Sequence, residues 1–367
     1  MPQPNDPSTH DDLINISITP AALASGTATL TTILVLQDNV TPGGGRYAEY
    51  ASSEEVAADV TAGNLTATSQ AIADDMFGQL NPPSKILFGG VALTASTETA
   101  PTALDACIAA GAEFYGVVYE SRTVARQLAL AVDVEAKADS GTFLLLGLQD
   151  DDADWLTSGI SAAWASAAGF ERTVMYYHDD NGADPTSDRL EACHFADRLS
   201  WDPDETSAGW NSTVSQVDNL ATALTQTQKQ FARANFANTA LPMGTRTSTY
   251  VDPGYNLAGR PVDHVVSADW LRTRVAEAVA DLITRVSERG TKITVDAQGQ
   301  ALVGGEIEKV FMQGVAAGHF LAYTLTPLLI TDADKTAGRV RFDGSAQLAV
   351  GVRQVTINLY FDTAELA

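Results

Sequence analysis

The chain has 367 residues, of which 45% are apolar, and its formal net charge is −24 at pH 7. This length suffices for two domains, or for one domain with a large insertion, each with a core of its own. The charge disfavours nucleic acid and anionic membranes as partners, because phosphate contacts need a basic surface. No apolar run is long enough to predict a membrane-spanning helix, and residues 1–12 lack the basic and apolar regions expected of a signal peptide.

The negative charge is unevenly distributed along the chain. Residues 1–228 contain 8 of the 22 Lys and Arg residues and 32 of the 46 Asp and Glu residues, whereas residues 229–367 contain 14 of each kind. Such an asymmetry fits an acidic part that faces solvent and a balanced part that contacts other protein, although a drift in composition between domains is the plainer explanation. The two cysteines, Cys107 and Cys193, predict no disulfide framework; we expect two buried free thiols, with a disulfide between them as the alternative.

The first expected elements are strands. Residues 13–19 alternate apolar and polar side chains, which is typical of a half-buried strand. Residues 29–36 form a β-branched apolar run and predict a more buried strand. Ser52 or Ser53 is expected to cap a helix, and a second helix is expected over 67–80.

From residue 83 to about residue 200 the pattern becomes regular. Short apolar runs recur about every 30 residues, and helical patterns separate them. This alternation indicates βαβ units and a parallel or mixed sheet that helices cover on both faces. The expected strands are 85–91, 114–119, 142–148 and 172–177, and the expected helices are 103–110, 122–137, 155–168 and 187–199.

The longest expected helix lies in the last third of the chain. It runs from Ala268 to Arg289, with Ser267 as its cap and Gly290 as its stop. The polar residues before it predict irregular structure. The other expected elements here are a boundary or long loop over 200–219, a helix over 220–235, an extended ordered loop over 238–263, a helix over 304–318, and strands over 320–330 and 338–350.

The chain ends as it begins, with an alternating strand. A terminal strand with one apolar face has to pair with a sheet, because an unpaired edge is a liability. Each strand therefore pairs within its own chain or is donated to the sheet of a neighbouring chain. Donation from both ends would link chains into a lattice. The apolar residues of the two strands are Ile14, Ile16, Ile18, Val355, Ile357, Leu359 and Phe361.

Two acidic segments follow expected strands, at the place where α/β proteins usually bind ligands. Residues 150–154 read Asp-Asp-Asp-Ala-Asp, but they lack the spacing and the glutamate of a calcium loop. A solvated acidic helix N-terminus is favoured over a metal site. Residues 178–182 read His-Asp-Asp-Asn-Gly, which a tight turn explains.

No catalytic motif is present in the sequence. Cys193 and His194 are adjacent, so on a helix they point about 100° apart and cannot act together as nucleophile and base; we expect a core cysteine beside a surface histidine. We predict no catalytic residue, no metal and no cofactor. The alternative function is an α/β hydrolase or nucleotide-binding enzyme that uses the strand-end loops 150–154 and 178–184.

The last third of the chain resembles contractile tail sheath proteins of myovirus-like phages. Three segments carry this resemblance, namely Phe231-Ala-Arg-Ala-Asn235, Gly259-Arg-Pro-Val-Asp263 and Ala268-Asp-Trp-Leu271, in this order before the long helix. Residues 352–362 resemble the donated final strand of that family, and residues 14–19 resemble its N-terminal arm. The middle α/β region carries no sheath signature; in sheath proteins this region is variable and faces outward.

The resemblance implies an α/β (α+β) fold. A sheath core domain, built from N- and C-terminal segments, would carry a βαβ-type insertion domain and extended terminal strand arms. The implied divisions are an N-terminal arm over 1–20, a core over 21–82 and 220–351, an outer α/β domain over 83–219 and a C-terminal arm over 352–367.

The resemblance also implies a structural rather than an enzymatic function. Hexameric rings would stack helically around a tail tube, tethered by donated strands, and contraction of a metastable lattice would drive the tube through the host envelope. The implied partners are further copies of the chain and the tail tube, baseplate and tail terminator proteins, in a virion tail assembled in the host cytoplasm. The parent particle is a phage, a tailocin or a related injection device.

The long helix is the implied tube contact. Four arginines surround its apolar stripe and would meet acidic groups on the tube. The alternative is that this helix belongs to the core and that its arginines are only solvated. The arginines concerned are Arg272, Arg274, Arg285 and Arg289. A tube or baseplate component is a third possibility, but tube proteins are usually small and β-rich.

Overall fold

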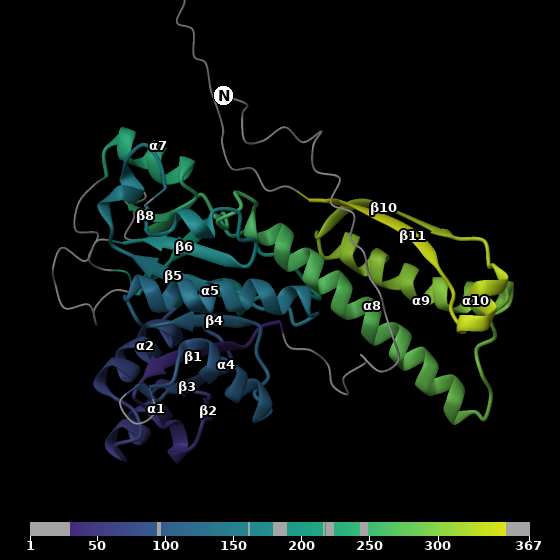
Figure 1. The fold of residues 1–367 in the computed structure, drawn as a ribbon, viewed down its shortest axis with the longest axis horizontal. Coiled ribbons are helices and arrows are strands. Elements are labelled where there is room, and N and C mark those ends of the chain that lie inside the picture. Colours follow the sequence, from purple (N-terminus) through teal and green to yellow (C-terminus); the bar gives the residue numbers. More distant parts are fainter. Residues whose placement is uncertain are drawn as a thin grey trace, which may run out of the picture.

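The computed structural model describes residues 30–93, 97–160, 162–178, 189–215, 217, 224–242 and 249–349. Residues 30–261 form an α/β domain around one large sheet, and residues 262–349 form a C-terminal unit. Helix α8 (Val262–Glu288) leads from the sheet into this unit (Figure 1). No helix among the described residues is long and apolar enough to cross a membrane.

Within the described residues, nine strands form the large sheet in the order β2-β3-β1-β4-β5-β6-β8-β9-β7. The strands from β3 to β8 in this order are parallel, and β2, β9 and β7 add antiparallel pairs at the two ends. The central strands are buried apolar runs, as expected for parallel strands covered on both faces. Their bounds are β1 Ile33–Asp38, β2 Tyr47–Tyr50, β3 Ile86–Val91, β4 Gly116–Tyr119, β5 Leu145–Asp150, β6 Thr173–Tyr177, β7 Ser212–Val214, β8 Asn238–Pro242 and β9 Thr249–Asp252.

Helices cover both faces of this sheet (Figure 1). Apolar side chains of α2 and α6 join the core on one face, and those of α4 and α5 join the core on the other. Ser52 caps α1, as predicted, and accepts a hydrogen bond from the Glu55 amide at 3.4 Å. The bounds are α1 Ser53–Thr61, α2 Ala67–Phe77, α4 Ala100–Ala109, α5 Val124–Asp139, α6 Leu190–Leu199 and α7 Gln226–Ala234.

The C-terminal unit consists of α8, α9 (Ala297–Ala316), the short α10 (Asp332–Ala337) and a sheet of two antiparallel strands, β10 (Phe320–Pro327) and β11 (Phe342–Leu348). The two long helices pack along each other, and the two strands lie over α9 (Figure 1). One apolar core runs without interruption from α2 and α6 through α8 to Phe311 and Phe320. The unit is therefore packed onto the α/β domain and does not have a separate core.

The α/β fold class and most expected elements are confirmed, but residues 155–168 are not a helix. Two short 3₁₀ turns, η4 (Ala153–Leu156) and η5 (Ala165–Ala167), occupy this segment. Gly159 adopts a positive φ of 130°, which interrupts helical geometry between them. The apolar spacing that suggested a helix instead reflects Leu156, Ile160 and Trp164, which pack against the core from irregular backbone.

Two further expectations need correction. The long helix begins at Val262, so Ser267 lies inside it and is not its cap. The segment 238–263 is not wholly a loop, because it supplies β8 and β9 to the sheet. The expected division of the chain into domains at residues 82 and 219 stays a prediction. Both cysteines are buried free thiols, as expected.

Candidate assembly site: the C-terminal unit and its joint

The first turns of α8 join the C-terminal unit to the α/β domain through a buried ion pair. The Asp269 carboxylate is fully buried and accepts two hydrogen bonds from the Arg172 guanidinium, one of them at 2.9 Å, and one from the Tyr115 hydroxyl at 2.8 Å. Burial opposes the charge of Arg172, but Asp269 more than offsets this and raises the Arg172 pKa. Burial, reinforced by the Asp269 charge, raises the pKa of Tyr115 well above its ordinary value. Asp269 therefore holds two strands of the sheet, β4 through the preceding Tyr115 and β6 through the preceding Arg172.

An aromatic ring is part of the same joint. The guanidinium of Arg172 lies 5.2 Å from the centre of the Phe143 ring, and that of Arg272 lies 5.1 Å from it. Arg272 also contacts Asp269, at 3.4 Å. Each guanidinium therefore contacts both the Asp269 carboxylate and the face of the Phe143 ring. Both interactions stabilise a positive charge that is partly removed from water.

The next residue of α8, Trp270, makes a second contact with the α/β domain. Its Nε1 donates to the Asp204 carboxylate at 2.7 Å, and its ring stacks on the His319 imidazole with the ring centres 4.6 Å apart. Arg274, one turn further, donates to the same Asp204 at 2.7 Å. The Asp-Trp-Leu stretch that carried the family resemblance is thus a structural joint.

The His319 side chain completes this joint. Its Nε2 lies 2.7 Å from the Pro203 carbonyl oxygen, and its Nδ1 lies 2.8 Å from the Ser267 hydroxyl. A carbonyl oxygen only accepts, so Nε2 carries the proton and Nδ1 of the neutral ring accepts from Ser267. Burial lowers the His319 pKa, which favours this neutral form. The Ser267 hydroxyl therefore binds the histidine instead of capping α8.

The two strands of the C-terminal unit have one packed face and one exposed face. Tyr323 of β10 stacks on Phe311 of α9 with the ring centres 5.0 Å apart, and Leu325 is partly buried against the same core. On the other face, Thr324 of β10 and Ser345 of β11 are exposed and their hydroxyls lie 2.8 Å apart. This outer face is polar and carries no packed helix within the described residues.

The edges of this small sheet are the distinctive feature of the unit. Among the described residues, β10 pairs with β11 and with no other strand, so the outer backbone edge of each strand is open. Two-stranded sheets are marginal on their own, and an open edge is a template for a further strand. Large apolar side chains lie exposed nearby, with Leu321 62% exposed and Leu329, which follows β10, 86% exposed.

The four arginines assigned to the tube contact do not form one group. Arg272 and Arg274 are held in the joint by Asp269 and Asp204. Arg285 is exposed but pairs with Glu306 of α9 at 3.0 Å. Arg289 is exposed at the end of α8, where no carboxylate of the described residues pairs with it.

Sequence reasoning missed Lys292, which lies three residues after Arg289 in the turn between α8 and α9. Lys292 is also exposed and has no carboxylate partner among the described residues. Gly290 ends the helix before Lys292, so a helical pattern of charges does not include it. The exposed cationic end of the unit is therefore Arg289 and Lys292, which we call the cationic tip.

The terminal strands cannot be placed in the same way. The residues assigned to strand donation, Ile14, Ile16, Ile18, Val355, Ile357, Leu359 and Phe361, all lie outside the described residues. Their assignment stays a prediction.

The acidic loop 150–154 is part of the core scaffold. Asp150 is buried, and its Oδ2 accepts the indole N–H of Trp155 at 2.9 Å and that of Trp164 at 2.7 Å. Two donors therefore occupy the oxygen that an active-site carboxylate would present. No group of three potential metal ligands occurs among the described residues. Most of the other loop, 178–184, lies outside them.

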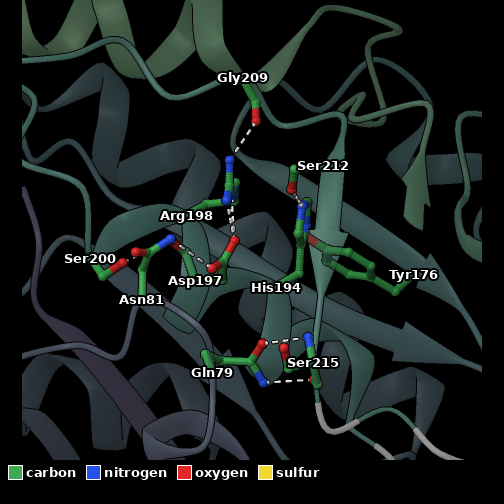
Figure 2. A network of polar contacts seen from close by, with 10 residues as sticks. All are labelled: Gln79, Asn81, Tyr176, His194, Asp197, Arg198, Ser200, Gly209, Ser212 and Ser215. Atoms are coloured by element: carbon green, nitrogen blue, oxygen red, sulfur yellow. Dashed lines mark hydrogen bonds and ion pairs between the residues drawn. The ribbon is translucent and has the colours of Figure 1, made fainter. Parts of the chain in front are cut away.

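His194 is not the surface residue that the sequence suggested. It is fully buried on α6, with the Tyr176 hydroxyl 2.7 Å from Nδ1 and the Ser212 hydroxyl 3.1 Å from Nε2 (Figure 2). Burial lowers its pKa well below the ordinary value, so the ring is neutral at pH 7. Nearby, the Gln79 side chain exchanges two hydrogen bonds with the Ser215 backbone. These contacts fasten α6 and the segment after α2 to residues 212–215.

No protein-family model and no curated protein matches this chain in sequence. Solved structures do match it in fold. A chain of the anti-feeding prophage (AFP) baseplate has a TM-score of 0.68 at 11% identity and matches 95% of this chain and 96% of that chain. A chain of the PVC sheath complex, from an extracellular contractile injection system in its contracted state, has a TM-score of 0.64 at 12% identity, over 96% and 95% of the two chains.

A sheath tail protein from Listeria innocua has a TM-score of 0.59 at 10% identity, over 90% of this chain and 97% of that chain. The similarity therefore includes both the α/β domain and the C-terminal unit. The chain has the fold of contractile sheath proteins over nearly its whole length. The resemblance that three short segments suggested is confirmed at the level of fold.

Proposed function

We propose that this chain is the structural subunit of a contractile tail sheath, which polymerises as stacked hexameric rings around a tail tube and contracts to drive the tube through a host envelope. The observation that carries the proposal is the similarity in fold to sheath proteins, which includes both the α/β domain and the C-terminal unit. One of these sheath structures is in the contracted state. The Asp150 and His194 side chains are buried and hydrogen-bonded within the α/β domain.

The open edges of β10 and β11 are the proposed acceptors of donated strands. The strands to be donated are the alternating segments 13–19 and 352–362 of neighbouring copies. Main-chain hydrogen bonds along each edge would supply affinity, and the apolar face of the donated strand would pack beside the partly buried residues Tyr323 and Leu325. Exchange of this kind keeps neighbours tethered while their packing changes.

The cationic tip is the proposed contact with the tail tube. Arg289 and Lys292 are exposed and unpaired within the described part of an otherwise acidic protein, and Arg285 lies one helical turn before them. Charges of this kind set orientation and salt sensitivity of a contact more than its total affinity. Baseplate and terminator proteins would meet the two ends of the polymer, in a virion tail or a related injection device.

The decisive experiment is electron microscopy of the purified chain at high concentration. We expect rings, sheets or tubes from the full chain, and folded monomers after deletion of residues 1–20 or 353–367. A finer test introduces Ile357→Asp with Leu359→Asp on the apolar face of the last strand. The matched control, Thr356→Asp with Asn358→Asp, carries the same charge on the opposite face.

Strand donation requires the first double variant to stay monomeric and the control to polymerise. If both truncated chains polymerise normally, donation is wrong. A full chain that stays monomeric under every condition tested would count against the sheath function itself.

The tube contact is tested with Arg289→Glu and Lys292→Glu together. We expect normal polymerisation of the variant without tube protein and weaker co-sedimentation with tube protein, by an amount that shrinks as salt rises. Lys335→Glu, at an exposed site on α10, is the control for added negative charge. Unchanged attachment of the tip variant would contradict this assignment.

A further inference from the structure

The cations of the acidic part of the chain are already engaged within the chain. Residues 1–228 contain eight Lys and Arg residues. Seven of them form ion pairs with carboxylates of the same chain, and the eighth, Arg189, is 3% exposed. The pairs are Arg46–Glu98, Lys85–Glu49, Arg122–Glu191, Arg126–Asp38, Lys137–Asp105 and Asp133, Arg172–Asp269, and Arg198–Asp197. The acidic part therefore has no unpaired exposed cation to offer to a second copy.

Many carboxylates of the acidic part, in contrast, are exposed and have no side-chain partner in the part of the chain that the structure describes. Residues 1–228 have a net charge of −24, which is the whole net charge of the chain. Exposed carboxylates without a side-chain partner among the described residues occur on well-separated elements of the α/β domain. They include Glu54 on α1, Glu113 before β4, Asp139 at the end of α5, Asp154 in η4 and Glu205 after α6.

The C-terminal unit differs in this respect. The residues of the unit, 262–349, contain nine basic and eleven acidic residues, so its net charge is close to zero. Its exposed cationic tip, Arg289 and Lys292, is free to meet carboxylates of another protein. Contacts between copies can therefore form through the unit, whereas residues 1–228 of two neighbours carry a large net charge of the same sign and repel one another.

From this arrangement we infer that the carboxylates of the α/β surface attract mobile cations from solution, and that ionic strength controls the polymerisation of this chain. The inference rests on the proposed sheath function, because it concerns how copies approach in a polymer. Mobile cations have to screen the carboxylates of adjacent α/β domains before the C-terminal units can join. Any small cation serves, since the described residues contain no cluster of metal ligands.

The range of the repulsion gives the expected salt dependence. The screening length is about 10 Å at 0.1 M salt and about 3 Å at 1 M. At the lower concentration, carboxylates on neighbouring α/β domains repel one another over about 10 Å. At the higher concentration, the repulsion is screened within about 3 Å. We therefore expect the chain to be monomeric near 0.1 M NaCl and polymeric near 1 M.

The test is sedimentation of the full chain across a series of NaCl concentrations, repeated with MgCl₂ at matched ionic strength. The two salts should give the same midpoint of polymerisation on the ionic-strength scale. A requirement for low concentrations of Mg²⁺ alone would indicate a specific bridging site and would overturn the inference. Polymerisation that does not change with salt would also overturn it, while leaving the sheath function intact.

High salt also strengthens apolar contacts, so a pair of matched variants separates the two effects. The first, Glu113→Gln with Asp139→Asn and Glu205→Gln, removes three exposed charges from the α/β domain. The second, Asp281→Asn with Glu288→Gln and Glu308→Gln, removes three exposed charges from the C-terminal unit. Both change the net charge of −24 by the same amount.

The first variant should polymerise at lower salt, because Coulomb repulsion scales with the product of the charges and falls by about a quarter. The second should keep the wild-type midpoint or move it much less. Equal shifts in the two variants, or no shift in the first, would show that the α/β surface does not control polymerisation. Absence of polymer at every salt concentration would contradict the sheath function together with this inference.

Discussion

The α/β domain and the C-terminal unit use their polar groups in different ways. In the α/β domain, the large sheet is covered on both faces, and the cations of its acidic part are paired or buried. In the C-terminal unit, a two-stranded sheet has open edges within the described residues, and Arg289 and Lys292 are exposed. A region whose sheet is covered and whose cations are paired specifies a fold, whereas a region with open strand edges and exposed unpaired cations is suited to assembly. The two regions meet at the buried Asp269 ion pair and share one apolar core.

The largest expected effect therefore concerns this joint. Asp269→Asn would leave the Arg172 guanidinium buried without its carboxylate, and breaking a buried ion pair in this way costs about 3–5 kcal/mol. We expect urea unfolding, followed by circular dichroism, to show a correspondingly lower midpoint. Glu277→Gln is the control, since it removes the outer, partly exposed pair with Arg274.

A double variant tests whether the loss of stability comes from the unpaired buried charge of Arg172. Arg172→Met with Asp269→Leu removes both charges, so it should be much less destabilising than Asp269→Asn alone. If the single substitution has the effect of the outer control, the two regions are joined by the continuous apolar core and not by the ion pair.

The next effect compares the same chemical change in both regions. Leu146→Ala in β5 removes a fully buried side chain and should lower the free energy of unfolding by about 2–5 kcal/mol. Leu329→Ala removes a side chain that is 86% exposed and should change it by less than about 0.5 kcal/mol. Calorimetry of the monomers measures both. The comparison fails if Leu329→Ala destabilises the monomer as strongly as Leu146→Ala.

Burial of one carboxylate, that of Glu120, should make the stability of the α/β domain depend on pH. Burial raises the pKa of Glu120 to about 7, and the Arg189 charge opposes this only in part. The folded state therefore binds the Glu120 proton more tightly than the unfolded state. Its stabilising contribution is present below about pH 4.5 and is lost as the pH rises through about 7.

Glu120→Gln removes this dependence. We expect the variant to be more stable than the wild type at pH 8, by about 1–3 kcal/mol, and similar to it at pH 5. Thermal unfolding at the two pH values measures the difference. A variant that is less stable at pH 8 would mean that the attraction between Glu120 and Arg189 outweighs the burial of the carboxylate.

The smallest expected effect again concerns the joint. Trp270→Phe keeps an aromatic ring against His319 but removes the indole N–H that donates to Asp204. Loss of one such hydrogen bond to a charged group should cost about 1–3 kcal/mol, with the lower end expected because Arg274 still binds Asp204. Denaturant unfolding measures this cost; a larger loss would show that the ring geometry, and not the hydrogen bond, holds the two regions together.

Much of the fold could be predicted from the sequence because parallel strands are short apolar runs and their helices have a clear period. Strands β3 to β6 and helix α5 lie close to their predicted places for this reason. The segment Trp155–Ala168 is not a helix although Leu156, Ile160, Trp164 and Ala167 recur at a spacing of three or four residues, which imitates a helical face. Only the three-dimensional structure shows that the two indoles of this segment bind one carboxylate, that of Asp150.

The candidate site was harder to predict, since its features depend on partners that are distant in the sequence. Arg272 and Arg289 look alike on a helical projection, yet Asp269 and Phe143 engage the first and leave the second exposed. His194 appeared to be a surface residue because nothing nearby in the sequence indicates that Tyr176 and Ser212 would enclose it. The open edges of β10 and β11 could not be inferred from local patterns at all.

Because the joint lies in the first half of α8, a small rotation of this helix at the joint would move its far end by a larger distance. The contacts of the joint extend from Ser267 to Arg274, whereas the cationic tip begins at Arg289. At 1.5 Å per residue, about 22 Å of helix lies beyond Arg274, whose bond to Asp204 is the last polar contact of the joint. A rotation of about 12° at the joint would displace the tip by about 4.7 Å, which is the spacing between two strands of a sheet. In the proposed sheath, such a rotation would misplace the tip by a full strand width, so the dense packing around Asp269 and Trp270 would limit the precision with which neighbouring copies are placed in register.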